Sequence, residues 1–355
     1  MLKVKIRTLT PLWTGDIDRE CKSIKETGII GSLRWWYEAL VRGLGGYACD
    51  PTSEGICSYK ESINEICHAC RIFGCTGLSK KFKIEANGLK CEDIFFVTSQ
   101  NTNRRWLNKI FENQNFSLEG NGKISVLGFQ KEIEEIISFL IWYTTEYGGI
   151  GAKTQNGFGQ TLVTNLDMKS VKEGFKQIKN MTEEDARRVE NPLWNCITNL
   201  FSLKFKIPEN NEIVEYYLNK AKIVKNAPED WKGRYIPCSF DIRYQGVINN
   251  KNFGLRNYFR DKIENTLADK LFGFSRGKNR AGSKIFVSHL YKEEKKEDFY
   301  YLKVWGFIPE SILSKTSFET LEDFKEEVRG QIEYIFGNIQ TVSDKIGEKT
   351  LKGVL

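Results

Sequence analysis

The residues best suited to chemistry are cysteines gathered in one part of the chain. Five of the nine cysteines are Cys49, Cys57, Cys67, Cys70 and Cys75. Cys67 and Cys70 have the C-x-x-C spacing that lets two thiolates reach one zinc ion. Because a structural zinc site needs four nitrogen or sulfur ligands, we expect Cys49 and Cys57 to complete it, with His68 and Cys75 as substitutes. The alternative is that these cysteines are small buried apolar residues, since their full spacing fits no standard finger.

A glycine-rich stretch at residues 147–159, YGGIGAKTQNGFG, is the second candidate site. It follows a predicted helix and precedes a predicted strand, whereas a P-loop or a dinucleotide fingerprint runs from a strand into a helix. We therefore predict no nucleotide cofactor. Such a loop can bring backbone amides close to phosphates, with Lys153 as the charge and further donors on the next side chains, Thr154, Gln155 and Asn156. A tight helix-to-strand return is the alternative reading.

Positive charge is concentrated in residues 242–284. This segment holds ten Lys or Arg and three Asp or Glu, so its charge of +7 equals that of the whole chain. Aromatic residues lie between the charges, a pattern that suits phosphate attraction and base stacking. A solvated helix face with its rings in the core is the alternative. The cations expected to contact RNA are Arg276, Lys278, Arg280 and Lys284.

Hydrophobic periodicity predicts the elements that must position these residues. In the first half we expect strands at 3–9, 82–84, 94–98, 123–129 and 161–164, and helices at 31–43, with Ser32 as N-cap, and 131–146. In the second half we expect strands at 201–207, 239–244, 283–291 and 299–308, and helices at 255–271 and 318–336. This order predicts an α+β protein of two tandem ferredoxin-like (RRM-like) domains, each an antiparallel sheet with helices on one face.

A short internal repeat supports two related domains. Ile72-Phe73-Gly74 recurs as Leu271-Phe272-Gly273, and the strand after it recurs beyond a longer loop. We expect an N-terminal domain at 1–167, a charged helical connector at 168–191 and a C-terminal domain at 192–355. Each half is long enough to bury its own core.

The composition describes a folded chain. Its 355 residues are 40% hydrophobic and contain 7 Pro, unlike a disordered protein. No apolar run is long enough to cross a bilayer, and the first residues alternate apolar with cationic instead of forming a signal peptide. We expect a cytoplasmic protein with no membrane partner.

These motifs together resemble the RAMP superfamily of CRISPR-associated proteins. Within it, the chain is similar to the family that forms the first subunit of type III-B, or Cmr, effector complexes. The resemblance is carried by residues 10–15 (TPLWTG), 31–37 (GSLRWWY) with 42–43, 67–74, 271–275 and 282–284. It covers nearly the whole chain.

The resemblance implies a non-catalytic subunit of an antiviral complex. Such a subunit binds CRISPR RNA and single-stranded target RNA near the 3′ end of the CRISPR RNA, and contacts other Cmr subunits. Carried over by motif, the implied RNA or assembly contacts are Gly149, Gly151, Lys153, Gly157, Gly159 and Arg34. We also expect Arg42 to contact RNA.

Two alternatives stay open. Some RAMP relatives are metal-independent endoribonucleases that process CRISPR RNA, often with a catalytic histidine. The chain has only His68, inside the cysteine cluster, and His289, in a strand-like run. We therefore favour a binding protein over an enzyme. The second alternative is a protein scaffold without RNA affinity, which a salt series would distinguish from a phosphate binder.

Overall fold

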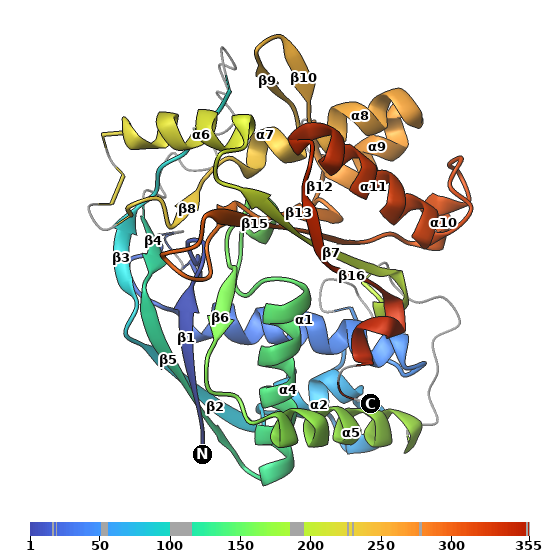
Figure 1. Ribbon diagram of the computed structural model, residues 1–355. Helices are drawn as coiled ribbons and strands as arrows, with labels where there is room; N and C mark the ends of the chain where they lie inside the picture. Colours follow the sequence, from blue (N-terminus) through green and yellow to red (C-terminus); the bar gives the residue numbers. More distant parts are fainter. Residues whose placement is uncertain are drawn as a thin grey trace.

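The computed structural model describes residues 1–15, 18, 20–50, 56–99, 116–184, 195–225, 227–228, 231–276, 279–352 and 354. Two larger antiparallel sheets, three two-stranded sheets and flanking helices make up these residues (Figure 1). The predicted fold class, an α+β protein with tandem ferredoxin-like domains, is confirmed. No helix in the described ranges combines the length and the apolarity needed to cross a membrane.

The first sheet has the strand order β2-β5-β1-β6. Its strands are β1 (Leu2–Thr8), β2 (Phe82–Asn87), β5 (Asn121–Gly128) and β6 (Thr161–Val163). The helices of this half are α1 (Glu26–Gly43), α2 (His68–Phe73), α4 (Lys131–Tyr147) and α5 (Met168–Glu184). A separate two-stranded sheet joins β3 (Lys90–Asp93) and β4 (Phe116–Glu119). With α1 between β1 and β2, and α4 between β5 and β6, this is the split βαβ topology.

The second sheet has the order β16-β7-β15-β14-β8, and β13 also pairs with β15. Its strands are β7 (Leu200–Pro208), β8 (Tyr235–Ile236), β13 (Ile285–Val287), β14 (Leu290–Tyr291), β15 (Phe299–Phe307) and β16 (Gln340–Ile346). Taking β14 as the second strand of the motif, β16-β7-β15-β14 repeats the order of the first sheet. The extra strand β8 lies at its edge.

Helices and hairpins complete the second half. The helices are α6 (Glu212–Lys222), α7 (Ser239–Arg243), α8 (Leu255–Lys262), α9 (Asn265–Phe272), α10 (Glu310–Leu313) and α11 (Leu321–Phe336). The hairpins are β9 (Gly246–Ile248) with β10 (Lys251–Phe253), and β11 (Phe274–Arg276) with β12 (Asn279–Ala281). Short 3₁₀ turns are η1 (Ile63–Glu65), η2 (Thr154–Asn156), η3 (Ile197–Asn199) and η4 (Gly347–Leu351).

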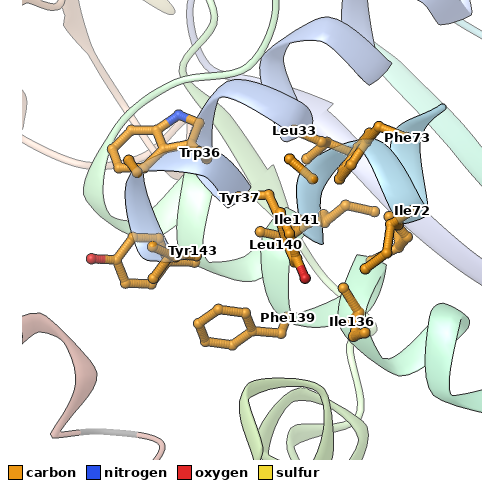
Figure 2. Packing of buried hydrophobic residues seen from close by; sticks show 14 of the residues in the cluster. Leu33, Trp36, Tyr37, Ile72, Phe73, Ile136, Phe139, Leu140, Ile141 and Tyr143 are labelled. Atoms are coloured by element: carbon orange, nitrogen blue, oxygen red, sulfur yellow. The ribbon is translucent and has the colours of Figure 1, made fainter. Parts of the chain in front are cut away.

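The first core forms where apolar faces of α1 and α4 meet (Figure 2). Trp36 of α1 packs edge-on against Tyr143 of α4, with ring centroids 5.6 Å apart. Phe73 of α2 packs in the same way on Phe82 of β2, at 5.3 Å. β2 alternates buried and exposed residues along its length, as a strand with one covered face should. The apolar residues of the predicted amphipathic helices and strand are therefore the ones that form the core.

The internal repeat is visible in the backbone. α2 ends at Gly74 with φ 84°, and α9 ends at Gly273 with φ 78°. The Lys81 amide then donates to the Ile72 carbonyl at 2.9 Å, and the Lys284 amide donates to the Leu271 carbonyl at 2.7 Å. The two copies therefore return from helix to strand by the same hydrogen bond.

Five predicted elements are wrong in detail. The single strand predicted at 283–291 is divided into β13 and β14. Residues 94–98 are not a strand, because Phe95 and Val97 join the core of the second half and the Val97 amide donates to the Pro237 carbonyl at 3.3 Å. Residues 239–244 contain the short helix α7 instead of a strand, since an apolar run this short fits either element. The single helix predicted at 255–271 is broken into α8 and α9, and α1 begins at Glu26 with Lys25, not Ser32, at its N-cap.

The first part of the predicted connector packs against the N-terminal core. α5 approaches α4 so closely that a Cβ on Gly174 would lie 2.0 Å from the Glu135 carbonyl oxygen. Phe175 and Phe139 have ring centroids 5.4 Å apart. Residues 185–191 lie outside the described residues, and the division at 167/168 and 191/192 stays a prediction.

Candidate nucleic-acid interface and metal centre

The four cysteines expected to bind metal come together around the start of α2. They are all buried, and their sulfur atoms all lie within 4.8 Å of one another. The Cys49 Sγ is 3.5 Å from that of Cys70 and 3.6 Å from that of Cys67. Zinc–sulfur bonds of about 2.3 Å in a tetrahedron hold sulfurs about 3.8 Å apart. The grouping of Cys49, Cys57, Cys67 and Cys70 is therefore confirmed, and its donors fit a closed structural zinc site.

Helix α2 and the loop before it position these thiols. Cys67 is the N-cap of α2 and Cys70 lies one turn further on. The Cys67 amide donates to the Cys57 Sγ at 3.4 Å. The substitutes His68 and Cys75 are not members of the four-thiol group.

The thiols interact strongly even without metal. Hydrogen bonding with Cys49 and then with Cys70 holds the pKa of the Cys67 thiol well below its usual range. Hydrogen bonding with Cys67 raises the pKa of Cys49 to about 12. One thiolate is therefore already favoured in the cluster, and the thiolate is the form that binds a metal.

The two arginines of α1 that were predicted as RNA contacts face this cluster. The Arg34 guanidinium donates to the Cys70 Sγ at 3.2 Å, to the Gly74 carbonyl at 3.0 Å and to Glu38 at 2.8 Å. Arg42 is buried and donates to the Cys49 carbonyl at 2.9 Å. Both side chains therefore support the cysteine loop, and Arg42 leaves no exposed surface for a phosphate.

The glycine loop, residues 148–160, forms a compact return from α4 to β6. Gly151, Gly157 and Gly159 all have positive φ. A Cβ on Gly159 would lie 2.2 Å from the Ile150 carbonyl oxygen, and one on Gly151 would lie 2.7 Å from that of Trp13. The tight-return reading of the sequence is thus correct for these glycines.

The same loop joins the two halves of the molecule. The His289 amide donates to the Gly157 carbonyl at 3.3 Å, and the Ser239 hydroxyl donates to the Asn156 carbonyl at 2.9 Å. The buried Arg243 guanidinium donates to the Gln155 carbonyl. The main chain at 155–157 is therefore fixed by residues of the second half.

Lys153 stands at the turn of the loop in the left-handed conformation, with φ 59°. Its Nζ lies 4.5 Å from the centroid of the Trp13 ring. Burial lowers the pKa of Lys153 to about 8. A neighbouring phosphate would favour the charged form of this lysine.

A cavity of about 660 Å³ lies beside the glycine loop. Its walls come from α1, from the loop and from residues 281–286 with Trp305. It brings together five of the predicted contact residues, which are Gly149, Gly151, Thr154, Gln155 and Lys284. Residues more than a hundred positions apart in sequence therefore share one site.

The rest of the basic segment is divided. The backbones of Arg276 and Arg280 belong to the β11–β12 hairpin, but the structure does not describe their side chains. Lys278 lies outside the described residues. Arg256 and Arg260 are ion-paired with Asp269. The rings of Phe253, Phe259 and Phe272 are buried in the second core, so they cannot stack on bases. Lys284 is the cation of this segment that lines the cavity.

Both histidines are unsuited to surface acid–base chemistry. His289 is fully buried, its Nδ1 accepts from the Ser239 amide at 3.3 Å, and burial lowers its pKa to about 3. His68 is 2% exposed. Neither imidazole lines the cavity.

Sequence reasoning missed the aromatic residues of the cavity, which are Trp35, Trp36, Phe286 and Trp305. The signal was available in α1. Consecutive positions of a helix point about 100° apart, so Trp35 and Trp36 cannot both lie in one narrow core stripe. Trp36 is buried, whereas Trp35 is only half-buried.

A family model matches part of the chain. Residues 5–162 match the model described as the RAMP superfamily. No curated protein matches. The family match covers the first sheet, α1, the cysteine cluster and the glycine loop.

The comparison with solved structures found chains of low identity. Cmr1 from Pyrococcus furiosus, in its apo form, is 12% identical, with 96% of this chain and 99% of that chain covered and a TM-score of 0.46. A chain of the type III-B Cmr-beta complex bound to cognate target RNA is 12% identical, with 99% of each chain covered and a TM-score of 0.41. A chain of the same complex with AMPPnP, in the presence of ssDNA, is 11% identical, with 94% and 99% covered and a TM-score of 0.41.

Proposed function

We propose that this protein, whose residues 5–162 match the RAMP superfamily model, is a non-catalytic RNA-binding subunit of a type III-B CRISPR (Cmr) effector complex. It holds guide or target RNA near the 3′ end of the CRISPR RNA. Its partners are CRISPR RNA, single-stranded target RNA and other subunits of the complex. Antiviral defence in the cytoplasm is the corresponding role.

The observation that carries this proposal is the cavity shared by the glycine loop and Lys284. The loop supplies main chain without Cβ atoms, and Lys284 supplies a positive charge. Together with Lys153 at the turn, this arrangement suits phosphate contacts, which position a nucleic acid without reading its sequence. The wider basic segment adds long-range attraction for RNA.

The metal has a supporting role in this proposal. Zinc would be held by Cys49, Cys57, Cys67 and Cys70, which form a closed set with no position left for water or substrate. Bound there, it would stabilise the α1–α2 loop against α1. The α1 face that lines the cavity would then be held in place.

Two histidines without access to the cavity favour binding over cleavage. A metal-independent endoribonuclease needs a proton donor or acceptor within reach of the ribose and phosphate. A scaffold without RNA affinity stays the other alternative, and both are outcomes of the experiment below.

We expect purified protein to bind labelled single-stranded RNA without cutting it, and to lose affinity steeply as salt rises. Lys284→Ala should weaken binding and reduce the slope of log K against log salt by about 0.7, the value for one lost contact to a single strand. The matched control is Lys172→Ala on α5, an exposed lysine outside the cavity. Affinity and slope are read from a salt titration, and RNA integrity from a gel.

Cleaved RNA would contradict the non-catalytic role, and absence of binding at every salt concentration would favour the scaffold. Equal slopes for Lys284→Ala and Lys172→Ala would remove Lys284 from the interface.

A further inference from the structure

The cavity beside the glycine loop has aromatic walls from two separate elements. Trp35 and Trp36 of α1 lie edge-to-face with centroids 5.4 Å apart. The paired strands β13 and β15 supply Phe286 and Trp305. Their rings stack with centroids 5.2 Å apart and an interplanar angle of 13°. The half-buried Trp35 is the most accessible of the four. Trp36, Phe286 and Trp305 are buried, so among these four rings Trp35 is the one that a nucleobase can stack on.

Small residues keep the cavity open. Gly31 lies within α1 and Gly282 precedes β13, and a Cβ added to either would meet no atom within 4 Å. Glycine inside a helix costs about 1 kcal/mol relative to alanine. No neighbouring atom requires residue 31 to be small. A larger residue would make the helix more stable, but its side chain would extend into the cavity.

The charged residues that line the cavity indicate which kind of ligand it can bind. Among the described residues that line the cavity, Lys284 is the only charged side chain, and there is no carboxylate. A cationic side chain of a partner protein would find no counter-charge here. A neutral ring with an attached phosphate matches both the half-buried Trp35 and the lysine. The volume of 660 Å³ is within the range of about 300–1,000 Å³ found for small-ligand sites.

We propose that this cavity receives one unstacked nucleobase of the bound RNA, with the adjoining phosphate at Lys284. The inference rests on the proposed RNA-binding function and adds a base subsite to it. The subsite accepts any base, because stacking uses the face that every base has.

The test fills the cavity without touching the phosphate contacts. Gly31→Leu places a good helix former where space is open, so the variant should fold. Its matched control is Gly330→Leu in α11, another exposed helical glycine whose Cβ would meet nothing within 4 Å. The probes are single-stranded RNAs of one length: one with all bases, one ribose–phosphate chain without bases, and one such chain with a single adenine.

The wild type should bind the RNA with bases about tenfold or more tightly than the base-free chain, and one adenine should recover most of that gain. Gly31→Leu should lose the gain and bind the base-free chain as tightly as the wild type does. Gly330→Leu should behave as the wild type. Adenosine monophosphate alone should not displace the RNA.

Equal binding of the three RNAs by the wild type, or a gain that survives in Gly31→Leu, would overturn the base subsite while phosphate binding stands. Displacement by adenosine monophosphate would show a mononucleotide site instead. If the wild type bound none of the RNAs, the proposed function itself would be wrong.

Discussion

Two units of this molecule, residues 68–84 and residues 265–287, share one backbone design but are held by different chemistry. In each, a helix ends at a glycine with positive φ and the chain returns to a strand by the same amide-to-carbonyl hydrogen bond. The strand then pairs one residue later with a glycine that precedes phenylalanine, Gly128 in the first unit and Gly306 in the second. Both units therefore have the same helix–glycine–strand backbone, although the side chains around them differ.

The surroundings differ in character. In the first unit, α2 is held by four thiols and by Arg34, which reaches both Cys70 and the Gly74 carbonyl. In the second, Arg256 and Arg260 of α8 hold α9 by pairing with Asp269 at 2.8 and 2.6 Å. No residue of the first unit lines the cavity, whereas Gly282 and Lys284 of the second unit do. One copy of the repeated unit therefore packs against the cysteine cluster, and the other lines the cavity.

The largest effect is expected from breaking the thiol support. Cys67→Ser removes one of the four proposed zinc ligands and a shared hydrogen-bond partner, so it should abolish zinc binding and reduce the free energy of unfolding by about 3–5 kcal/mol. Elemental analysis and thermal unfolding with and without chelator measure this. Cys91→Ser, an exposed cysteine outside the four-thiol group, is the control. Protein that carries no zinc when purified from zinc-rich medium would contradict the metal assignment.

A smaller and equal effect is expected at the shared turn. Gly74→Ala places a Cβ 2.9 Å from the Leu78 carbonyl oxygen, and Gly273→Ala places one 2.8 Å from the Ala281 carbonyl oxygen, each in a conformation reserved for glycine. Each should destabilise the protein by about 2–3 kcal/mol, measured by denaturant unfolding. Gly337 also has positive φ, but a Cβ there would meet no atom within 4 Å. Gly337→Ala therefore measures the cost of the backbone conformation without the cost of a steric clash. If only one of the two variants were destabilised, the units would not share one device.

The smallest effect is expected from the ion pairs of the second unit. Burial opposes ionisation of Asp269, but hydrogen bonds from Arg256 and Arg260 outweigh it and lower the pKa of the carboxyl. Because this pKa is lower in the folded state, the stabilisation is complete above about pH 4 and is lost as pH falls through the folded value. Asp269→Asn should therefore cost about 1–2 kcal/mol near neutral pH, discounted for the partly exposed arginines.

The pH dependence makes this last prediction specific. In unfolding experiments at several pH values, the difference between the wild type and Asp269→Asn should shrink as the carboxyl of the wild type is protonated. A difference that stayed constant down to acid pH would show that Asp269 acts by packing and not by charge.

Local patterns predicted much of the architecture. Alternating and amphipathic runs placed β1, β5, β7, β15, α4 and α11 close to their observed bounds. The C-x-x-C spacing identified the four-thiol group, and the glycine density identified the loop at the junction. Predictions failed where a segment takes its partners from the other half, as Phe95 does beside Trp231 at 5.5 Å. A short extended run carries the same pattern whether it pairs in a sheet or docks on a distant core.

The sequence by itself determined what depends on near neighbours: the periodicity of the strands and helices, the four thiols, and the repeated helix–glycine–strand unit. Only the tertiary structure decided which cations lie at the cavity. Arg42 and Arg243 are buried as donors to backbone carbonyls, whereas Lys284 reaches the cavity. The physical reason is that a side chain's burial and partners are set by packing between segments distant in sequence, and charge counts do not record it.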